Sequence, residues 1–247
     1  MAGYSYGLLR FGSSQVQQAG SLLNASFQTF TVGMSKQVSA QDTVALNFID
    51  TEFRYDQSNA AFSSRGGFAG WTHAFSPAVT LASTAGATIV DRSSSNPGAP
   101  GTPGQSSVSS NAQNTITPRG NAVLTWRDST TTLALAYGLA VSPSYQFAAQ
   151  PLLTNFVTFS MTQVTPIPQL VGLASVNYGR GDEIGSKSVN AVSYTSVQAT
   201  GGFLYSFTPK TFLNVLYQYA NYDNQSGATT NSFDRHVVSI SIAQAFY

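Results

Sequence analysis

Two histidines, His73 and His236, are the only side chains that could form a metal pair or act as a catalytic base near neutral pH. The chain has no cysteine, and no acidic metal-ligand cluster accompanies either histidine. Asp234 and Ser239 lie near His236 and complete the residue types of a serine hydrolase, but neighbours along a strand point to alternating faces. We therefore predict no catalytic residue, no metal and no cofactor, and we interpret both histidines as rim or interface residues.

Charged side chains near the expected ends of long loops are a second candidate set. Opposed acidic and basic groups around a pore would create a transverse field that selects polar solutes. The alternative is that these groups are simply solvated at the headgroup boundary. The pore-lining or rim candidates are Asp50, Glu52, Arg54, Asp91, Arg92, Arg119, Asp234 and Arg235.

The tripeptide Arg180-Gly181-Asp182 matches a cell-adhesion motif, but three residues are too short a pattern to indicate adhesion. Glycine is the residue that adopts positive φ angles without strain. We therefore expect Gly179 and Gly181 to form an external turn.

Composition limits the class of protein to which these residues can belong. Charged residues make up 9% of the chain and aromatic residues 12%, whereas ordinary soluble domains carry about 25% charged residues. No apolar run approaches the roughly 18 residues that a membrane-spanning helix needs. Low charge with abundant aromatic and small residues fits a β-barrel, in which alternate residues face lipid. A secreted all-β sandwich or solenoid is the alternative.

Short apolar stretches bounded by turn residues recur along the chain, and their connections alternate between brief and long, as in an up-and-down barrel. Three of the brief connections contain a Ser/Thr-Pro step, and proline belongs at such edges because it cannot donate to a ladder. An even number of strands would place both termini on one side. The predicted strands are 3-11, 22-35, 43-55, 66-75, 79-91, 116-126, 131-141, 154-164, 169-178, 194-207, 211-222 and 233-247.

The alternation of side chains is clear in the segments 131-141, 194-207 and 211-222, where large apolar residues oppose small or polar ones. We assign the larger apolar set of each segment to lipid. The segment 43-55 is ambiguous, because its apolar residues share a parity with acidic and basic ones. Either these charges lie beyond the membrane, or they face the lumen after a bulge.

The inner face inferred in this way consists mainly of Ala, Ser, Gly, Thr, Asn and Gln. Twelve strands tilted by about 40° would close into a cylinder roughly 24 Å across, which small side chains cannot fill. We therefore expect water in the lumen, or a plug. The loop at about 93-114 is a candidate constriction, although a mobile external loop is the simpler interpretation.

The last stretch, Phe233 to Tyr247, places Val238, Ile240 and Ile242 on one side and small residues on the other, and it ends in the aromatic pair Phe246-Tyr247. It resembles the terminal strand of bacterial outer-membrane β-barrels, the porin-like proteins of Gram-negative bacteria. That resemblance implies pairing with the first strand and location in the outer membrane. The hairpin within 205-242 also resembles barrels associated with exopolysaccharide and exosortase systems.

We therefore predict a single all-β domain over 1-247, a transmembrane up-and-down antiparallel β-barrel of about twelve strands. Its expected function is an outer-membrane channel, for diffusion of small polar solutes or for export of a polymer or polypeptide. A closed barrel acting as a structural anchor or assembly partner is the alternative, and an outer-membrane lipid hydrolase is a remote one. Nothing at the N-terminus reads as a signal peptide, so we expect that an export signal was replaced by the initiator methionine.

The partners we expect are outer-membrane lipid and lipopolysaccharide, together with the transported small polar solute or polymer. A homo-oligomer or a complex partner stays open. The net charge of +1 argues against nucleic acid.

Overall fold

The computed structural model of the chain describes residues 2–9, 25–55, 60–94, 114–143, 151–184, 192–208, 210–226 and 229–244, and these residues are almost entirely β-strand. No helix among them is long and apolar enough to cross a membrane. The loop expected at 93-114 falls almost wholly outside these ranges, as do Phe246 and Tyr247.

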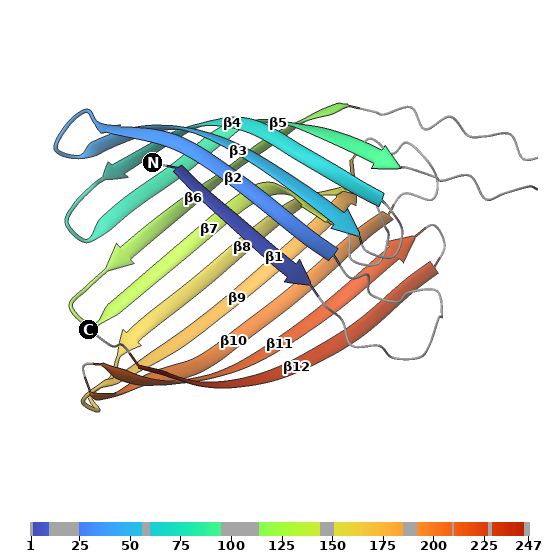
Figure 1. Cartoon of the computed structure of the whole chain (residues 1–247). Coiled ribbons are helices and arrows are strands. Elements are labelled where there is room, and N and C mark those ends of the chain that lie inside the picture. Colours follow the sequence, from blue (N-terminus) through green and yellow to red (C-terminus); the bar gives the residue numbers. More distant parts are fainter. Residues whose placement is uncertain are drawn as a thin grey trace, which may run out of the picture.

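Twelve antiparallel strands follow one another in chain order and form a single up-and-down sheet. The sheet curls into a barrel, with the short connections gathered at one end, where β1 also begins and β12 ends (Figure 1). The predicted fold class and strand number are confirmed. The pairing of β1 with β12 implied by the family resemblance stays a prediction. The strands are β1 Ala2–Leu9, β2 Ala25–Gln37, β3 Asp42–Tyr55, β4 Ala60–Ala74, β5 Val79–Ser94, β6 Thr115–Arg127, β7 Thr131–Pro143, β8 Pro151–Val164, β9 Leu170–Glu183, β10 Val192–Thr208, β11 Thr211–Ser226 and β12 Thr229–Gln244.

The three Ser/Thr-Pro connections are stabilised by their hydroxyl groups. In the connection between β4 and β5, the hydroxyl of Ser76 accepts a hydrogen bond from the backbone N–H of Ala78 at 3.2 Å. Thr165 and Thr208 each accept the N–H two residues further on in the same way, also at 3.2 Å. A side chain that bonds its own backbone in this way holds a turn locally. The hydroxyl residue therefore contributes to these turns as well as the proline.

The large apolar side chains of the strands lie mainly on the outer face of the sheet and are exposed. Cross-strand pairing keeps them together: Leu135 lies opposite Leu124 on one side and Phe159 on the other. We call this surface the outer belt. One member from each strand, in order from β1 to β12, is Tyr6, Val32, Leu46, Trp71, Ile89, Leu124, Leu135, Val157, Val176, Phe203, Tyr217 and Ile240.

An exposed apolar surface that continues round all twelve strands is far larger than a water-facing protein presents, and it suits contact with lipid. On β12 the apolar residues predicted to face outward are strongly exposed, with Val238, Ile240 and Ile242 at 66%, 69% and 70%. The predicted orientation of the larger apolar residues in β7, β10 and β11 is also confirmed.

The ambiguity in the segment 43-55 is resolved by the register of β3. Its pairing with β2 and β4 runs without a bulge through the apolar and the charged part of the strand. Asp50, Glu52 and Arg54 therefore share the outer face with Leu46 and Phe48, and they lie nearer the long-loop end. Of the two alternatives, the bulge that would turn these charges into the lumen is absent, and the charges stay on the outer face.

The inner face carries large aromatic residues as well as the small residues predicted for it. Phe62 and Phe68, on the inner face of β4, are 1% and 7% exposed, so the prediction of a wall dominated by small side chains was incomplete. Four inner rings lie directly opposite a glycine of the neighbouring strand. One is Phe68 opposite Gly86, and in the other three the tip of the ring covers the glycine. These three pairs are Gly7 with Phe27, Gly138 with Phe156, and Gly181 with Tyr194.

In each pair the ring lies along the wall and covers the glycine. A Cβ added to Gly138 would clash with the tip of the Phe156 ring, and the same holds for the other two pairs. The rings are therefore accommodated because their cross-strand partners have no side chain, an arrangement in which an aromatic residue covers a neighbouring glycine.

Replacement of Gly138 by alanine should destabilise the barrel, because the added methyl group must displace the Phe156 ring. Overpacking of this kind costs about 1–3 kcal/mol. The urea midpoint of the refolded protein in detergent micelles measures the loss. Gly67→Ala is the matched control, because nothing lies within 4 Å of a Cβ at that position. A Gly138→Ala/Phe156→Ala double variant should lose no more than Phe156→Ala alone; additive losses would contradict the packing described.

Candidate lumen and rim sites

Arg119 is an inward-facing charge in the middle part of the barrel. It lies on β6 with the same parity as Thr117, which is 3% exposed on the inner face. Its guanidinium carbon is 5.4 Å from the ring centroid of Phe68 on β4, a cation–π contact that holds the side chain across the intervening β5. Arg119 is half-buried, and among the described residues it has no carboxylate partner.

A cavity of about 270 Å³ surrounds this guanidinium. Its lining residues come from strands β2 to β8, so side chains from a large part of the wall converge on it. We call it the Arg119 cavity. Its lining includes the side chains of Asn47, Ile49, Phe68, Thr84, Asn121 and Phe156.

A second cavity, of about 320 Å³, continues along the inner face of β1 to β3. It shares Thr31 and Asn47 with the Arg119 cavity and extends to Gly3 and Ser5. The two cavities therefore form neighbouring open spaces along one side of the lumen.

At the long-loop end, part of the lumen is filled by an apolar cluster. Tyr55, Phe62 and Val90 are almost fully buried there. The ring of Phe53 lies 4.7 Å from that of Phe62 and 5.7 Å from that of Phe27, measured between centroids. The same cluster includes Ile184, directly after β9, with Val141 of β7 and Leu153 of β8 packed against it. The packing at this end therefore joins side chains of β2 to β5 with side chains of β7 to β9.

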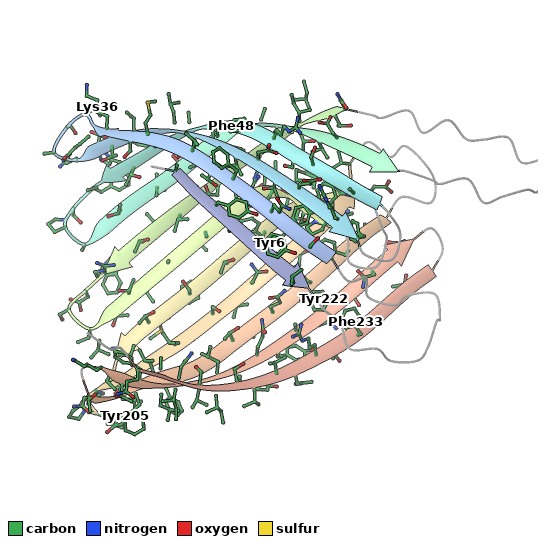
Figure 2. The ribbon with its side chains drawn as sticks, in the orientation of Figure 1. Tyr6, Lys36, Phe48, Tyr205, Tyr222 and Phe233 are labelled. Carbon is green, nitrogen blue, oxygen red and sulfur yellow. The ribbon has the colours of Figure 1, made fainter. Side chains whose placement is uncertain are left out.

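The opposite wall at the same end is lined by polar and aromatic groups. The hydroxyl groups of Thr154 and Tyr194 are 3.0 Å apart, and the amide of Gln198 donates to the hydroxyl of Tyr222 at 3.0 Å. The Tyr222 ring stacks on that of Phe233 across β11 and β12, with centroids 4.9 Å apart (Figure 2). This wall therefore offers hydroxyl groups and flat aromatic surfaces side by side.

The acidic and basic residues of β3 and β4 form ion pairs on the outer face. Arg54 pairs with Glu52 at 2.8 Å and Arg65 with Asp50 at 3.4 Å. Exposed pairs of this kind add little stability. They border a groove of about 520 Å³ whose lining includes Asp91. The position of this groove next to the outer belt suits contact with lipid headgroups.

The candidate charges divide between the two faces according to the strand registers. Asp50, Glu52, Arg54, Asp91 and Asp234 lie on the outer face, whereas Arg119 and Arg235 lie on the inner face. The backbone of Arg92 pairs with Phe62, and its side chain is not among those described.

Asp234 is held on the outer face of β12 by neighbours on β11. It accepts hydrogen bonds from the hydroxyl of Tyr219 at 3.0 Å and from the amide of Asn221 at 2.9 Å. These contacts place the carboxylate in a hydrogen-bonded group of polar side chains. The group lies nearer the long loops than the belt residues of the same two strands.

The Arg180-Gly181-Asp182 segment lies within β9, so the prediction of an external turn was wrong. No positive φ is found at Gly179 or Gly181, and Gly181 instead makes room for the ring of Tyr194. Arg180 and Asp182 form an exposed pair at 3.6 Å.

Both histidines lie on the outer face, in separate hydrogen-bonded groups. His73 Nδ1 is 2.7 Å from a carboxylate oxygen of Asp42, and Ser39 donates to the other oxygen at 2.7 Å. His236 Nδ1 is 2.7 Å from the hydroxyl of Tyr217. Neither histidine in the described structure bonds a serine hydroxyl, the contact that nucleophile activation needs. The described ranges also contain no group of three or more His, Cys, Asp or Glu that could hold a metal.

Sequence reasoning missed the large aromatic residues of the inner face, which include Phe68, the partner of Arg119. Applied to β4, the rule that the larger apolar set faces lipid would have turned Phe62 and Phe68 outward, because the outer positions near them are small. The usable signal is Trp71, which lies opposite the belt residue Val44 and fixes the face of the whole strand. Phe156 could not be assigned in this way, because both faces of β8 carry aromatic residues.

Comparison with known proteins gives only structural similarity. No family model matches the chain, and no curated protein matches it. The chain is similar to the CymD monoaromatic hydrocarbon channel, with 13% identity, coverage of 100% of this chain and 78% of that chain, and a TM-score of 0.44. It is similar to LpxR from Salmonella typhimurium, with 6% identity, coverage of 92% and 90%, and a TM-score of 0.39.

A third similar structure is the translocator domain of the autotransporter NalP from Neisseria meningitidis. The identity is 15%, the coverage is 90% of this chain and 81% of that chain, and the TM-score is 0.33.

A charge placed in the outer belt should be far less tolerated than one on the inner face. Leu135→Arg puts a guanidinium in contact with lipid, which costs about 2–4 kcal/mol near the bilayer midplane. Ala136→Arg, one residue along β7, points to the lumen and should cost less. Urea titration of both variants folded in phospholipid vesicles measures the difference. Equal losses would contradict the assignment of the two faces.

Proposed function

We propose that the chain forms an outer-membrane channel in a Gram-negative bacterium, through which small polar solutes diffuse. The observation that carries this proposal is the contrast between the two faces of the sheet: an exposed apolar belt outside, and open cavities with a half-buried cation inside. A lipid-facing exterior with a polar interior is the arrangement of a barrel that conducts solutes.

Small solutes fit the interior better than a polymer or polypeptide does. The cluster around Phe62 joins side chains of β2 to β5 with Ile184, beyond β9, at the long-loop end. The open cavities beside Arg119 have volumes of about 270 and 320 Å³. Charge on the inner face is sparse, so selection would come from a few residues, chiefly Arg119.

The outer charges support a role at the membrane boundary. The groove beside Asp50 and Arg65 lies on the outer face, where the outer belt ends towards the long loops. There it would meet the headgroup region of the outer leaflet, including lipopolysaccharide. This group of residues then anchors the barrel at the correct depth and takes no part in conduction.

A planar-bilayer recording tests the channel and separates the two sets of charges. The wild-type chain should show stable open conductance with a preference for chloride over potassium, because the mid-lumen charge is positive. Arg119→Gln should lower that preference, whereas the matched outer variant Arg54→Gln should leave it unchanged. Silence of the folded protein would instead favour the alternative of a closed structural anchor.

Single cysteines test whether the lumen holds water, and the natural absence of cysteine makes the labelling specific. Ser160→Cys faces inward and Phe159→Cys faces the belt on the same strand. A membrane-impermeant maleimide added to vesicles should modify the inward cysteine and leave its neighbour unmodified. Protection of both cysteines would indicate a dry or plugged interior, and reaction of Phe159→Cys alone would reverse the faces.

A further inference from the structure

The guanidinium of Arg119 differs from those of the other described arginines. Arg54, Arg65 and Arg180 are exposed and paired with carboxylates. Arg127, next to a short connection, and Arg235, on the inner face of β12, are also exposed. Arg119 alone in the described part of the chain is half-buried and lacks a carboxylate partner.

An unpaired, partly desolvated guanidinium has donors that need an acceptor, and leaving them unsatisfied is unfavourable. The contact with Phe68 fixes the position of the group and satisfies none of its N–H donors. The planar arrangement of those donors matches a carboxylate, which can accept two parallel hydrogen bonds. The cavity therefore has a fixed cation that faces open space.

The rest of the lining suits a flat apolar body with few polar contacts. Phe156 and Ile49 provide apolar surface on two sides of the cavity. Thr84 donates to the amide oxygen of Asn121, which leaves the two N–H donors of that amide for a ligand. One cation, additional neutral donors and aromatic walls define the ligand chemistry.

We infer that the Arg119 cavity is a binding site for an aromatic monocarboxylate on its way through the lumen. The carboxylate would pair with the guanidinium of Arg119, and the ring would pack against Phe156 and Ile49. The lining supplies a single cation, so a dianion would keep an unpaired charge. A strongly hydrated inorganic anion would lose its water to apolar walls.

This inference deepens the proposed function and rests on it for the passage of the solute through the lumen, but binding at the site can be measured without conduction. Binding must be weak enough for the solute to leave, so dissociation constants in the millimolar range are expected. Cationic solutes of the same shape should be rejected, because the charge would be repelled and its ring would gain little.

The test uses benzoate as the probe and the full chain. Saturation-transfer NMR on the protein in detergent micelles should show benzoate binding, with cyclohexanecarboxylate weaker, and with acetate and benzylamine not detected. Arg119→Gln should weaken benzoate at least about tenfold, the loss expected for a charge-assisted hydrogen bond. Arg119→Lys should recover part of the affinity, because it keeps the charge and loses the planar fork. Arg235→Gln, an inner-face variant at the long-loop end, is the matched control and should bind like the wild type.

The same variants in a planar bilayer should show benzoate-dependent interruptions of current in the wild type that Arg119→Gln removes. If the wild type conducts chloride but benzoate neither binds nor interrupts the current, the site is refuted and the channel remains. If binding depends on Arg119 in micelles but no current is seen, the site stands and the channel proposal fails. Acetate binding as tightly as benzoate would refute the aromatic part of the inference.

Discussion

The ladder of backbone hydrogen bonds between successive strands is the constraint on which the rest of the structure depends. In a lipid environment every backbone donor and acceptor must be paired within the protein, so the strands cannot separate or slip independently. A shift by one residue would exchange the outer and inner faces of a strand. The register of β3, unbroken from Thr43 to Tyr55, shows how this constraint keeps charged residues on the same outer face as the apolar residues before them.

The same register determines the interior. Because side chains alternate strictly, Arg119 and its aromatic partner Phe68 reach the lumen from strands that are not neighbours. Their contact requires both strands to hold the correct register simultaneously. The position of the inner cation is therefore a property of the sheet as a whole, although one side chain carries the charge.

The sequence predicted the strands and the short connections well, since both depend on local signals. Turn residues and the period of two are readable within ten residues, which is why β7 and β12 were assigned to the correct face. The limits of strands were harder to predict. The strand β9 continues through Arg180-Gly181-Asp182, because backbone pairing persists where the lipid-facing pattern has ended.

The inner wall was the least predictable part. The pairs that shape it, such as Gly138 with Phe156, join residues from different strands. Neither residue alone predicts which residue will be its partner. The sequence pattern distinguishes apolar from polar positions, but it does not predict which ring will lie over which glycine. The face on which a charged residue lies is similarly hard to predict. The sequence around Arg54 and Arg119 gives no clear difference, and only the pairing of their strands shows that Arg54 lies on the outer face and Arg119 in the lumen.

A ring that lies flat over a glycine narrows the lumen only by the thickness of the ring. A ring that stood away from the wall would narrow the lumen by its full length. In the proposed channel, the three pairs in which the ring tip covers a glycine would therefore help to set the width of the passage. A single substitution at Gly7, Gly138 or Gly181 would displace the opposite aromatic ring towards the lumen and leave the outer face of the barrel unchanged. One amino-acid substitution could therefore change the size limit for solutes while the exterior stays the same. Related channels with different size limits would be expected to differ first at these glycines.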